Sequence, residues 1–439
     1  MKQFRTDAII AWLLLVIFGG LVIHAPMTVW LTAHGAPDWV KAWKEVLLFI
    51  AAVLIIGDMV HRKALSLFQD KLLWAIFGYA VLHIVVALAG TGSLHSVVMG
   101  LLIDLRYVGY AAAVYLFLHQ YPGYRDSFVR VGIVGAVVVV GFALLQTIMP
   151  RDGLKYLGYS DMTIKPYILL DENPEYVRMN STLRGPNPLG AYAMIVLLGV
   201  VAYGVAGGRR LKESAKAWLQ WFLAVGAGVA LVVSYSRSAA LGLVAGLAVM
   251  LAVHGRGLTR RQYGGIVAAL LGLALLVYSV RDTALYKNIV LHDNPTTGAA
   301  YTSDQGHADS LSIGIAKMLQ QPFGAGVGST GSASLVGDAP LIIENQYLMI
   351  AHEVGWLGLG LFVTIWAWVL WRLWREHEGW FSRMTLASGI GLAVIAMTWP
   401  VLSDDPIAMI WWGMAAVVLG PPTIMKGKRH GTAPHKKAA

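Results

Sequence analysis

The sequence contains no cysteine, so disulfide bonds, thiolate nucleophiles and cysteine metal sites are excluded from its chemistry. It is also poor in charge, because only 13% of its 439 residues are Asp, Glu, Lys or Arg, whereas 57% are hydrophobic. A typical soluble domain carries about 25% charged residues. The mean hydropathy of +0.62 is likewise high. The composition therefore predicts a protein whose solvent is the lipid bilayer.

The net charge of +10 does not indicate nucleic-acid binding, because the basic residues stand in short clusters between apolar runs. In a multi-pass membrane protein such clusters set the orientation of the helices. The first apolar run, residues 8–30, is longer than the core of a signal peptide and lacks a small-residue cleavage site. We therefore expect it to be retained as a helix.

Twelve apolar runs come close to the roughly 20 residues that a helix needs to cross the hydrocarbon core. They start at Ala8, Trp43, Leu72, Val97, Phe128, Pro188, Ala217, Ala239, Gly264, Gln346, Met384 and Pro406. With the N-terminus inside, 22 of the 34 Lys and Arg fall on the cytoplasmic side, eleven on the outer side and one, Arg106, within a span. Positive residues resist translocation. The pattern predicts an all-α membrane protein of about 12 spans with both termini cytoplasmic: one membrane domain over residues 1–425 and a basic cytoplasmic tail over 426–439.

Two predicted outer loops, at about 150–187 and 281–345, are too long to be simple connections, and long loops often carry function. Within the second, His307 to Gln321 has apolar positions at helical spacing, which predicts a short helix on the outer face. The following stretch, Gly326 to Gly331, has the spacing of a dinucleotide-binding fingerprint. Because no strand precedes it, we interpret it as a tight turn.

Three arginines near outer helix ends are candidate diphosphate ligands, because a planar guanidinium binds such an anion in a bidentate manner. Arg237 lies between two spans with almost no loop around it. Arg184 precedes Asn187, which is a potential cap for the helix that starts at Pro188, and Arg178 adds to the same patch. The alternatives are an arginine that extends to lipid phosphates and arginines that are merely solvated.

Candidate acids and bases stand in the same outer segments. Glu344 opens the tenth span with Asn345, and it shares a helix face with Tyr347 through their i,i+3 spacing. It either complements the helix dipole or acts as a general base. His307 is a second candidate base, and Asp404 lies in the short outer loop before the last span. We expect no metal, because the outer loops hold no histidine pair at ligand spacing.

Two charged residues, Asp104 and Arg106, interrupt the fourth span. Charges within a span are costly when they face lipid. We therefore expect both side chains to face the interior of the helix bundle.

Four short patterns resemble those of O-antigen ligases and polymerases. The stretch from Glu344 to Gly358, Glu-Asn-Gln-Tyr-Leu-Met-Ile-Ala-His-Glu-Val-Gly-Trp-Leu-Gly, resembles the family's His-Asn-x-Tyr-Leu through Glu-x-Gly-x-x-Gly. Ser236-Arg-Ser238 resembles its Ser-Arg entry into a span, and Gly185-Pro-Asn-Pro188 its Pro-Asn entry. Gln321-Pro-Phe-Gly-Ala-Gly-Val-Gly328 resembles its Pro-Leu-Gly-x-Gly-x-Gly turn. The patterns occur in the family's order over roughly the C-terminal 260 residues.

This resemblance implies a membrane glycosyltransferase, without metal or cofactor, on the periplasmic face of a bacterial inner membrane. Such an enzyme moves a glycan from a polyprenyl diphosphate to an acceptor hydroxyl on a glycan or lipid, as in lipopolysaccharide assembly. The family's arginines bind the diphosphate and its histidine activates the acceptor. Here Glu344 stands at the histidine position, so either Glu344 or His307 is the base. The alternative class is a transporter or a flippase of lipid-linked glycans, for which paired broken helices at mid-membrane and internal symmetry are typical.

The predicted orientation is testable in this cysteine-free chain. Single cysteines at Ser160 and Ser332 should react with a membrane-impermeant thiol reagent added to intact cells from outside, because both lie in predicted outer loops. A cysteine at Gly208 should not react. Labelling of Gly208→Cys from outside would overturn the topology and every site that depends on it.

Overall fold

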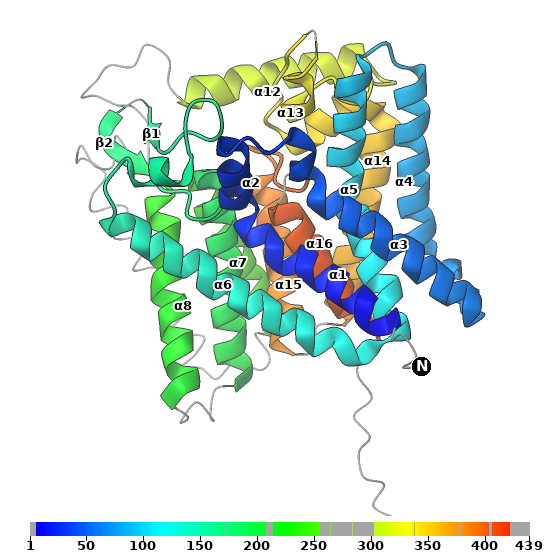
Figure 1. Ribbon diagram of the computed structural model, residues 1–439, viewed down its shortest axis with the longest axis horizontal. Coiled ribbons are helices and arrows are strands. Elements are labelled where there is room, and N and C mark those ends of the chain that lie inside the picture. Colours follow the sequence, from blue (N-terminus) through cyan, green and yellow to red (C-terminus); the bar gives the residue numbers. More distant parts are fainter. Residues whose placement is uncertain are drawn as a thin grey trace, which may run out of the picture.

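The computed structural model describes residues 6–171, 173–207, 214–254, 264, 283, 303–337, 339–376, 379–403 and 406–421. Its architecture is a bundle of long helices, with one two-stranded sheet (Figure 1). The first half contains α1 (Thr6–Gly20), α2 (His24–Ala33), α3 (Trp43–His61), α4 (Lys71–Ala89), α5 (Leu94–Gln120) and α6 (Arg125–Ile148). The second half contains α7 (Pro186–Gly207), α8 (Ser214–Val233), α9 (Arg237–His254), α12 (Ser303–Gln320), α13 (Gly331–Ser334), α14 (Gln346–Arg375), α15 (Trp380–Ile395) and α16 (Ile407–Leu419).

The prediction of membrane helices is confirmed in its coarse form. Six helical segments are long and apolar enough to cross a bilayer, and four shorter apolar helices accompany them among the described residues. Eleven of the twelve predicted starts fall within four residues of an observed helix start. The run that starts at Gly264 extends outside the described residues. The number of spans and the orientation of the termini stay predictions.

The bundle is held by apolar contacts that continue from one helix to the next. α16 is buried along its whole length and packs against α5 and α15, while α15 packs against α7 and α9. Trp411 and Trp412 of α16 are completely buried, and Trp366 of α14 lies against both rings. Because α16 is apolar on every side, it forms the centre around which the other helices are arranged.

The two charged residues of α5 face the bundle interior, as expected. Asp104 is 4% exposed, and its Oδ2 lies 4.0 Å from Nε2 of His83 in α4. Arg106 Nη1 lies 3.3 Å from Oε1 of Glu45 in α3. Each charge therefore has an ionisable partner on a neighbouring helix, which reduces the cost of burying it.

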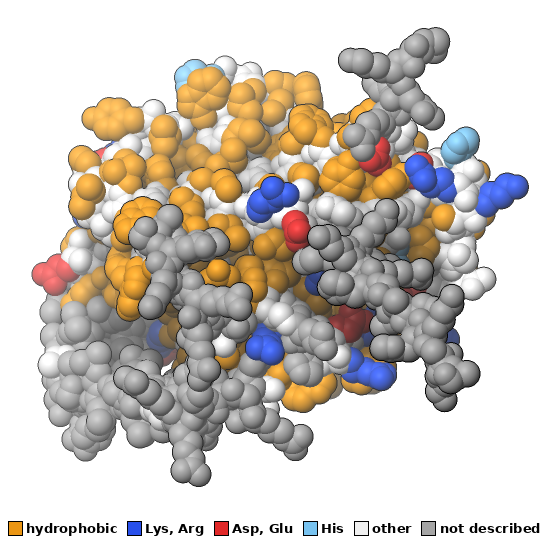
Figure 2. Space-filling model, turned by 90° about the horizontal axis from the view of Figure 1, so that it is seen from below, with side chains coloured by type: hydrophobic (Ala, Val, Ile, Leu, Met, Phe, Trp, Pro, Cys, Tyr) orange, Lys and Arg blue, Asp and Glu red, His pale blue; other side chains and the backbone are white. Residues whose placement is uncertain are grey.

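Both long loops contribute structure to the same end of the bundle. The first contains a 3-10 turn (Gly153–Leu157) and the antiparallel pair of β1 (Ile168–Leu170) and β2 (Asn173–Arg178), which the hydropathy pattern did not predict. The second contains α12, which starts four residues earlier than predicted and lies across the helix ends (Figure 1). α1 begins at the opposite end. Figure 2 views that opposite end, where Lys and Arg side chains are scattered over an apolar surface.

Candidate functional site

Arg237 is positioned by a tight turn between two helices. α8 ends at Val233 and α9 begins at Arg237, and the chain reverses through Tyr235, whose φ of +50° lies in the left-handed region. The first residue of α9 therefore points out of the bundle toward α12. There the guanidinium forms an ion pair with Asp304, in the first turn of α12. Sequence reasoning missed Asp304, because an acidic residue in a polar loop carries no signal of its own.

Arg178, at the end of β2, lies beside this turn. Its Nε donates a hydrogen bond to the carbonyl of Ser234 at 3.0 Å, and its Nη2 donates to Oδ1 of Asn187 at 2.6 Å. Burial lowers the pKa of Arg178 to about 10, and the nearby charge of Arg237 adds to the lowering. The group is still a cation at neutral pH. The structure thus brings Arg178 and Arg237 together, although 59 positions separate them in the chain.

Asn187 was predicted to cap α7, and that prediction is wrong. The helix begins at Pro186, so Asn187 already lies in its first turn. Its side-chain oxygen accepts the hydrogen bond from Arg178 instead. Arg184 is half-buried on the segment that leads into the same helix end. Asn187 therefore orients an arginine beside the N-terminus of α7, an end of a helix that favours anions.

The two candidate bases lie in contact. Nδ1 of His307, on α12, lies 2.5 Å from Oε2 of Glu344, and the side chains are 38% and 37% exposed. The backbone N–H of Glu344 donates to Oγ of Ser310, one turn further along α12. The hydrogen bond with Glu344 raises the pKa of His307, against the opposing effect of partial burial. Both side chains are therefore partly exposed.

These pairs form one continuous cluster at the end of the bundle where α12 lies. Asp304 and His307 are three residues apart on α12 and so share a face of that helix. Asp304 contacts Arg237, and His307 contacts Glu344. We call Arg178, Arg237, Asp304, His307 and Glu344 the charged cluster. It comes from β2, α9, α12 and the start of α14.

The remaining predicted candidates have structural partners or lie outside the description. Asn345 caps α14, because its Oδ1 accepts from the backbone N–H groups of Tyr347 and Leu348 at 3.0 and 3.1 Å. The Tyr347 hydroxyl donates to the carbonyl of Ala393 in α15. Both residues thus fix the start of α14, directly after Glu344. Asp404 lies outside the described residues.

A glycine-rich turn contacts α14 two turns after its start. α14 is broken at Val354 and Gly355, and residues 321–331 dock into the break. The N–H groups of Ala325 and Gly326 donate to the carbonyls of His352 and Glu353, at 2.6 and 3.1 Å. The predicted tight turn is confirmed, since Gly324, Gly326, Gly328 and Gly331 all have positive φ.

Glu353 fixes this turn with its side chain. It is 3% exposed, and its Oε1 accepts from the N–H groups of Gly328 and Thr330, at 3.1 and 3.4 Å. Oγ1 of Thr330 in turn accepts from the N–H of Ile343 at 3.2 Å. Ile343 directly precedes Glu344. We call this series of contacts the Glu353 clamp, and it connects the break in α14 to the charged cluster.

Comparison with known families supports one interpretation of these motifs. Residues 222–363 match the family described as O-antigen ligase. We call residues 222–363 the O-antigen ligase segment, after the family to which they are similar. The resemblance found in the sequence is thus confirmed, and it supports a membrane enzyme that transfers glycans, at this coarse level. No curated protein matches the chain. The O-antigen ligase segment contains Arg237, Asp304, His307, Glu344 and the Glu353 clamp, whereas Arg178 and Arg184 precede it.

In the described parts of the chain, no group of three or more His, Asp or Glu side chains is arranged to hold a metal ion. Within the charged cluster, Arg178 and Arg237 supply guanidinium groups. Metal independence stays a prediction.

The contact between His307 and Glu344 predicts a pH-dependent stability. A histidine with a raised pKa contributes stability that is fully present below its unfolded pKa, about 6.5, and is lost as the pH rises through its higher folded pKa. The melting temperature of His307→Ala should therefore fall furthest below that of the parent near pH 6, and the difference should shrink by about pH 9. His34→Ala is the matched control, because His34 is exposed and its described side-chain contacts are with Trp30, through the backbone carbonyl and the ring, and with no carboxylate. A difference that does not vary with pH would contradict the ion pair.

The Glu353 clamp predicts that a glutamine, but not a leucine, can replace Glu353. Leucine would leave two buried N–H groups without an acceptor, at about 1–3 kcal/mol each, whereas glutamine keeps a side-chain carbonyl. Ala333, 2% exposed in α13, is a suitable reporter when changed to cysteine. We expect slow thiol labelling of Ala333→Cys alone and with Glu353→Gln, and at least tenfold faster labelling with Glu353→Leu. Equal protection in all three proteins would show that the clamp does not hold the turn.

Proposed function

We propose that this protein is an inverting glycosyltransferase that moves a glycan from a polyprenyl diphosphate to an acceptor hydroxyl, without a metal ion, at the outer face of the inner membrane. The observation that carries the proposal is the charged cluster. Two guanidinium groups lie beside a half-exposed carboxylate and imidazole in contact with each other, at one end of a membrane helix bundle. The match to the O-antigen ligase family supports the same class of reaction.

The proposed reaction follows from the charges. The acceptor oxygen attacks the anomeric carbon, and its proton passes to the base. The bond between that carbon and the diphosphate oxygen breaks, and the polyprenyl diphosphate leaves with the electron pair. Arg178 and Arg237 neutralise the leaving group, with Arg184 beside them, which is the role of preorganised positive charge in such transfers. Attack opposite the leaving group inverts the anomeric configuration.

The base in this proposal is the Glu344 carboxylate, with His307 as the alternative. A protonated His307 pairs with the Glu344 carboxylate before the reaction, since the two side chains are in contact. When the carboxylate accepts the acceptor proton, it becomes neutral and the ion pair is lost. The raised pKa of His307 favours the charged imidazole, so the carboxylate is the more suitable acceptor near neutral pH.

Arg237→Lys tests the diphosphate site. Lysine keeps the charge but loses the planar, bidentate guanidinium, so we expect loss of most activity in a protein that still folds and inserts. Transfer from a purified lipid-linked donor, in the presence of EDTA, measures the effect. Activity close to that of the parent would contradict a role in diphosphate binding and would favour the alternative, in which Arg237 only contacts lipid phosphates. Arg184→Lys should give a similar loss.

Asp304 provides the internal control for that experiment. Its carboxylate pairs with the Arg237 guanidinium, so an incoming diphosphate must exchange with it. Asp304→Asn should lower the KM for the donor, whereas Arg237→Lys should raise it. An unchanged donor KM in Asp304→Asn would show that the diphosphate does not compete with Asp304 for Arg237.

Glu344→Gln decides the base. Glutamine keeps the volume and much of the hydrogen bonding but cannot accept the proton, so we expect a rate loss of about 10²-fold to 10⁴-fold. Glu344→His should retain partial activity, because it restores the residue of the family's motif. A comparable loss in His307→Ala with a nearly intact Glu344→Gln enzyme would assign the base to His307. Transport of a labelled lipid-linked glycan without a new glycosidic bond would support the flippase class instead.

A further inference from the structure

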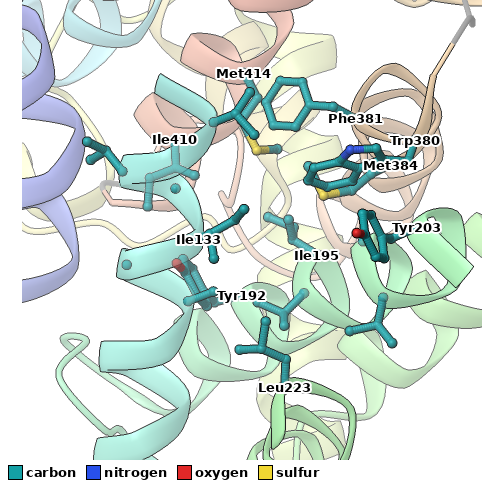
Figure 3. A pocket seen from close by; sticks show the side chains of 18 of the residues that line it. Ile133, Tyr192, Ile195, Tyr203, Leu223, Trp380, Phe381, Met384, Ile410 and Met414 are labelled. Atoms are coloured by element: carbon teal, nitrogen blue, oxygen red, sulfur yellow. The ribbon is translucent and has the colours of Figure 1, made fainter. Parts of the chain in front are cut away.

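A second site lies within the membrane bundle, away from the charged cluster. It is a cavity of about 310 Å³ between α1, α6, α7, α8, α15 and α16 (Figure 3). The lining is almost entirely apolar, with side chains such as Ile133, Ile195, Leu223, Met384 and Met414 pointing into it. None of the proposed catalytic residues lines it.

The cavity extends along α7. Its lining residues on α7 extend from Tyr192 to Tyr203, which is a helix length of about 16 Å at 1.5 Å per residue. On α6 the lining contains small residues, among them Gly132, Gly135 and Ala136. A Cβ added at Gly132 or at Gly135 would come no nearer than 3.4 Å to its neighbours. The small side chains of α6 therefore keep space open along α7, with the dimensions of a hydrocarbon chain.

The two ends of the cavity differ. Tyr203 lies near the end of α7, Gln220 near the start of α8, and Trp380 is the first residue of α15. The rings of Tyr203 and Trp380 are in contact, and Figure 3 shows them together on one side, away from Tyr192. Tyr and Trp with such polar tips are typical of the interface between lipid chains and head groups. This polar end is opposite to the start of α7, where Arg178 bonds Asn187.

The apolar middle of the cavity is not a site for water, because a water molecule needs two to four polar partners. Protein interiors are close-packed, so an unfilled space of this length loses dispersion contacts along its whole lining. The molecules available inside a bilayer are lipids. We propose that the cavity binds one acyl chain of a membrane phospholipid, whose polar head lies beside Tyr203, Gln220 and Trp380.

The position of the polar groups distinguishes this lipid from the proposed donor. The donor's diphosphate belongs at the charged cluster, so its chain would enter from the end of α7 that carries Asn187. The Asn187 end of the cavity has the Tyr192 hydroxyl, whereas Tyr203, Gln220 and Trp380 gather at the other end, on the side that the positive-inside count predicts to be cytoplasmic. A phospholipid of that leaflet fits both the apolar length and the position of the polar end.

The experiment uses the full-length protein, purified in a mild detergent, and native mass spectrometry of the bound lipid. We expect about one phospholipid per chain in the parent. Gly132→Leu and Gly135→Leu place a side chain in the cavity and should lose at least four fifths of that lipid. Gly228→Leu is the matched control, because Gly228 lies on α8 outside the lining and an added Cβ meets nothing within 4 Å. Equal retention in the filled variants and the control would overturn the proposal.

A second measurement keeps the test valid if the filled variants fold poorly. A photoreactive benzoylphenylalanine at Phe381, which points into the cavity in Figure 3, should crosslink a phospholipid in vesicles of phosphatidylethanolamine and phosphatidylglycerol. The same group at Phe49, 70% exposed on α3, serves as the background. A crosslink no stronger than at Phe49 would overturn the proposal. So would a crosslink to added polyprenyl phosphate in preference to phospholipid, because it would assign the cavity to the donor.

Discussion

The candidate site depends on one interaction, the docking of the glycine-rich turn into the break in α14. A break in a membrane helix frees carbonyl groups that hydrocarbon cannot satisfy. Here Ala325 and Gly326 donate to the carbonyls of His352 and Glu353, and the N–H of Trp356 donates to the carbonyl of Pro322. The turn follows α12 directly in the chain, and the helix it enters begins next to Glu344. The hydrogen bonds that satisfy the carbonyl groups at the break therefore also fix α12 and Glu344 relative to each other.

The backbone at this junction explains why glycine is needed. Gly355 has φ +72°, and a Cβ there would lie 2.5 Å from the carbonyl oxygen of Pro322. Gly328 has φ +79°, and its Cβ would lie 2.2 Å from the carbonyl oxygen of Ser96 in α5. The turn is thus wedged between α5 and α14, with no room for a side chain on either side. Two motifs that look unrelated in the sequence, the glycine-rich stretch and the Glu-x-Gly of α14, are the two halves of one contact.

The sequence predicted the helices well, since a membrane span is encoded by local hydropathy, and it predicted α12 from the spacing of its apolar residues. It selected Arg237, His307 and Glu344 as separate candidates. It could not pair them, because the contact of Arg237 with α12 joins residues 67 positions apart and depends on how the helices pack. Asn187 was assigned as a cap because capping is the commonest use of such a residue, whereas tertiary structure gave it an arginine to orient. The β1–β2 pair was missed because β2 is polar and lies in a loop without a regular apolar pattern.

The contact of His307 with Glu344 bears on the replacement of the motif's histidine by Glu344. The motif has a histidine at the position of Glu344, and this chain has an imidazole within 2.5 Å of that carboxylate, supplied by a different helix. The imidazole and the carboxylate are in contact and so act as one pair. Replacing the histidine by glutamate therefore does not remove imidazole chemistry from this place. It adds an acceptor that is in contact with His307, and it ties the reactivity of that acceptor to α12, the same helix whose Asp304 neutralises Arg237. In the proposed reaction, a diphosphate that displaces Asp304 acts on the helix that carries His307, so donor binding and the state of the base are physically linked.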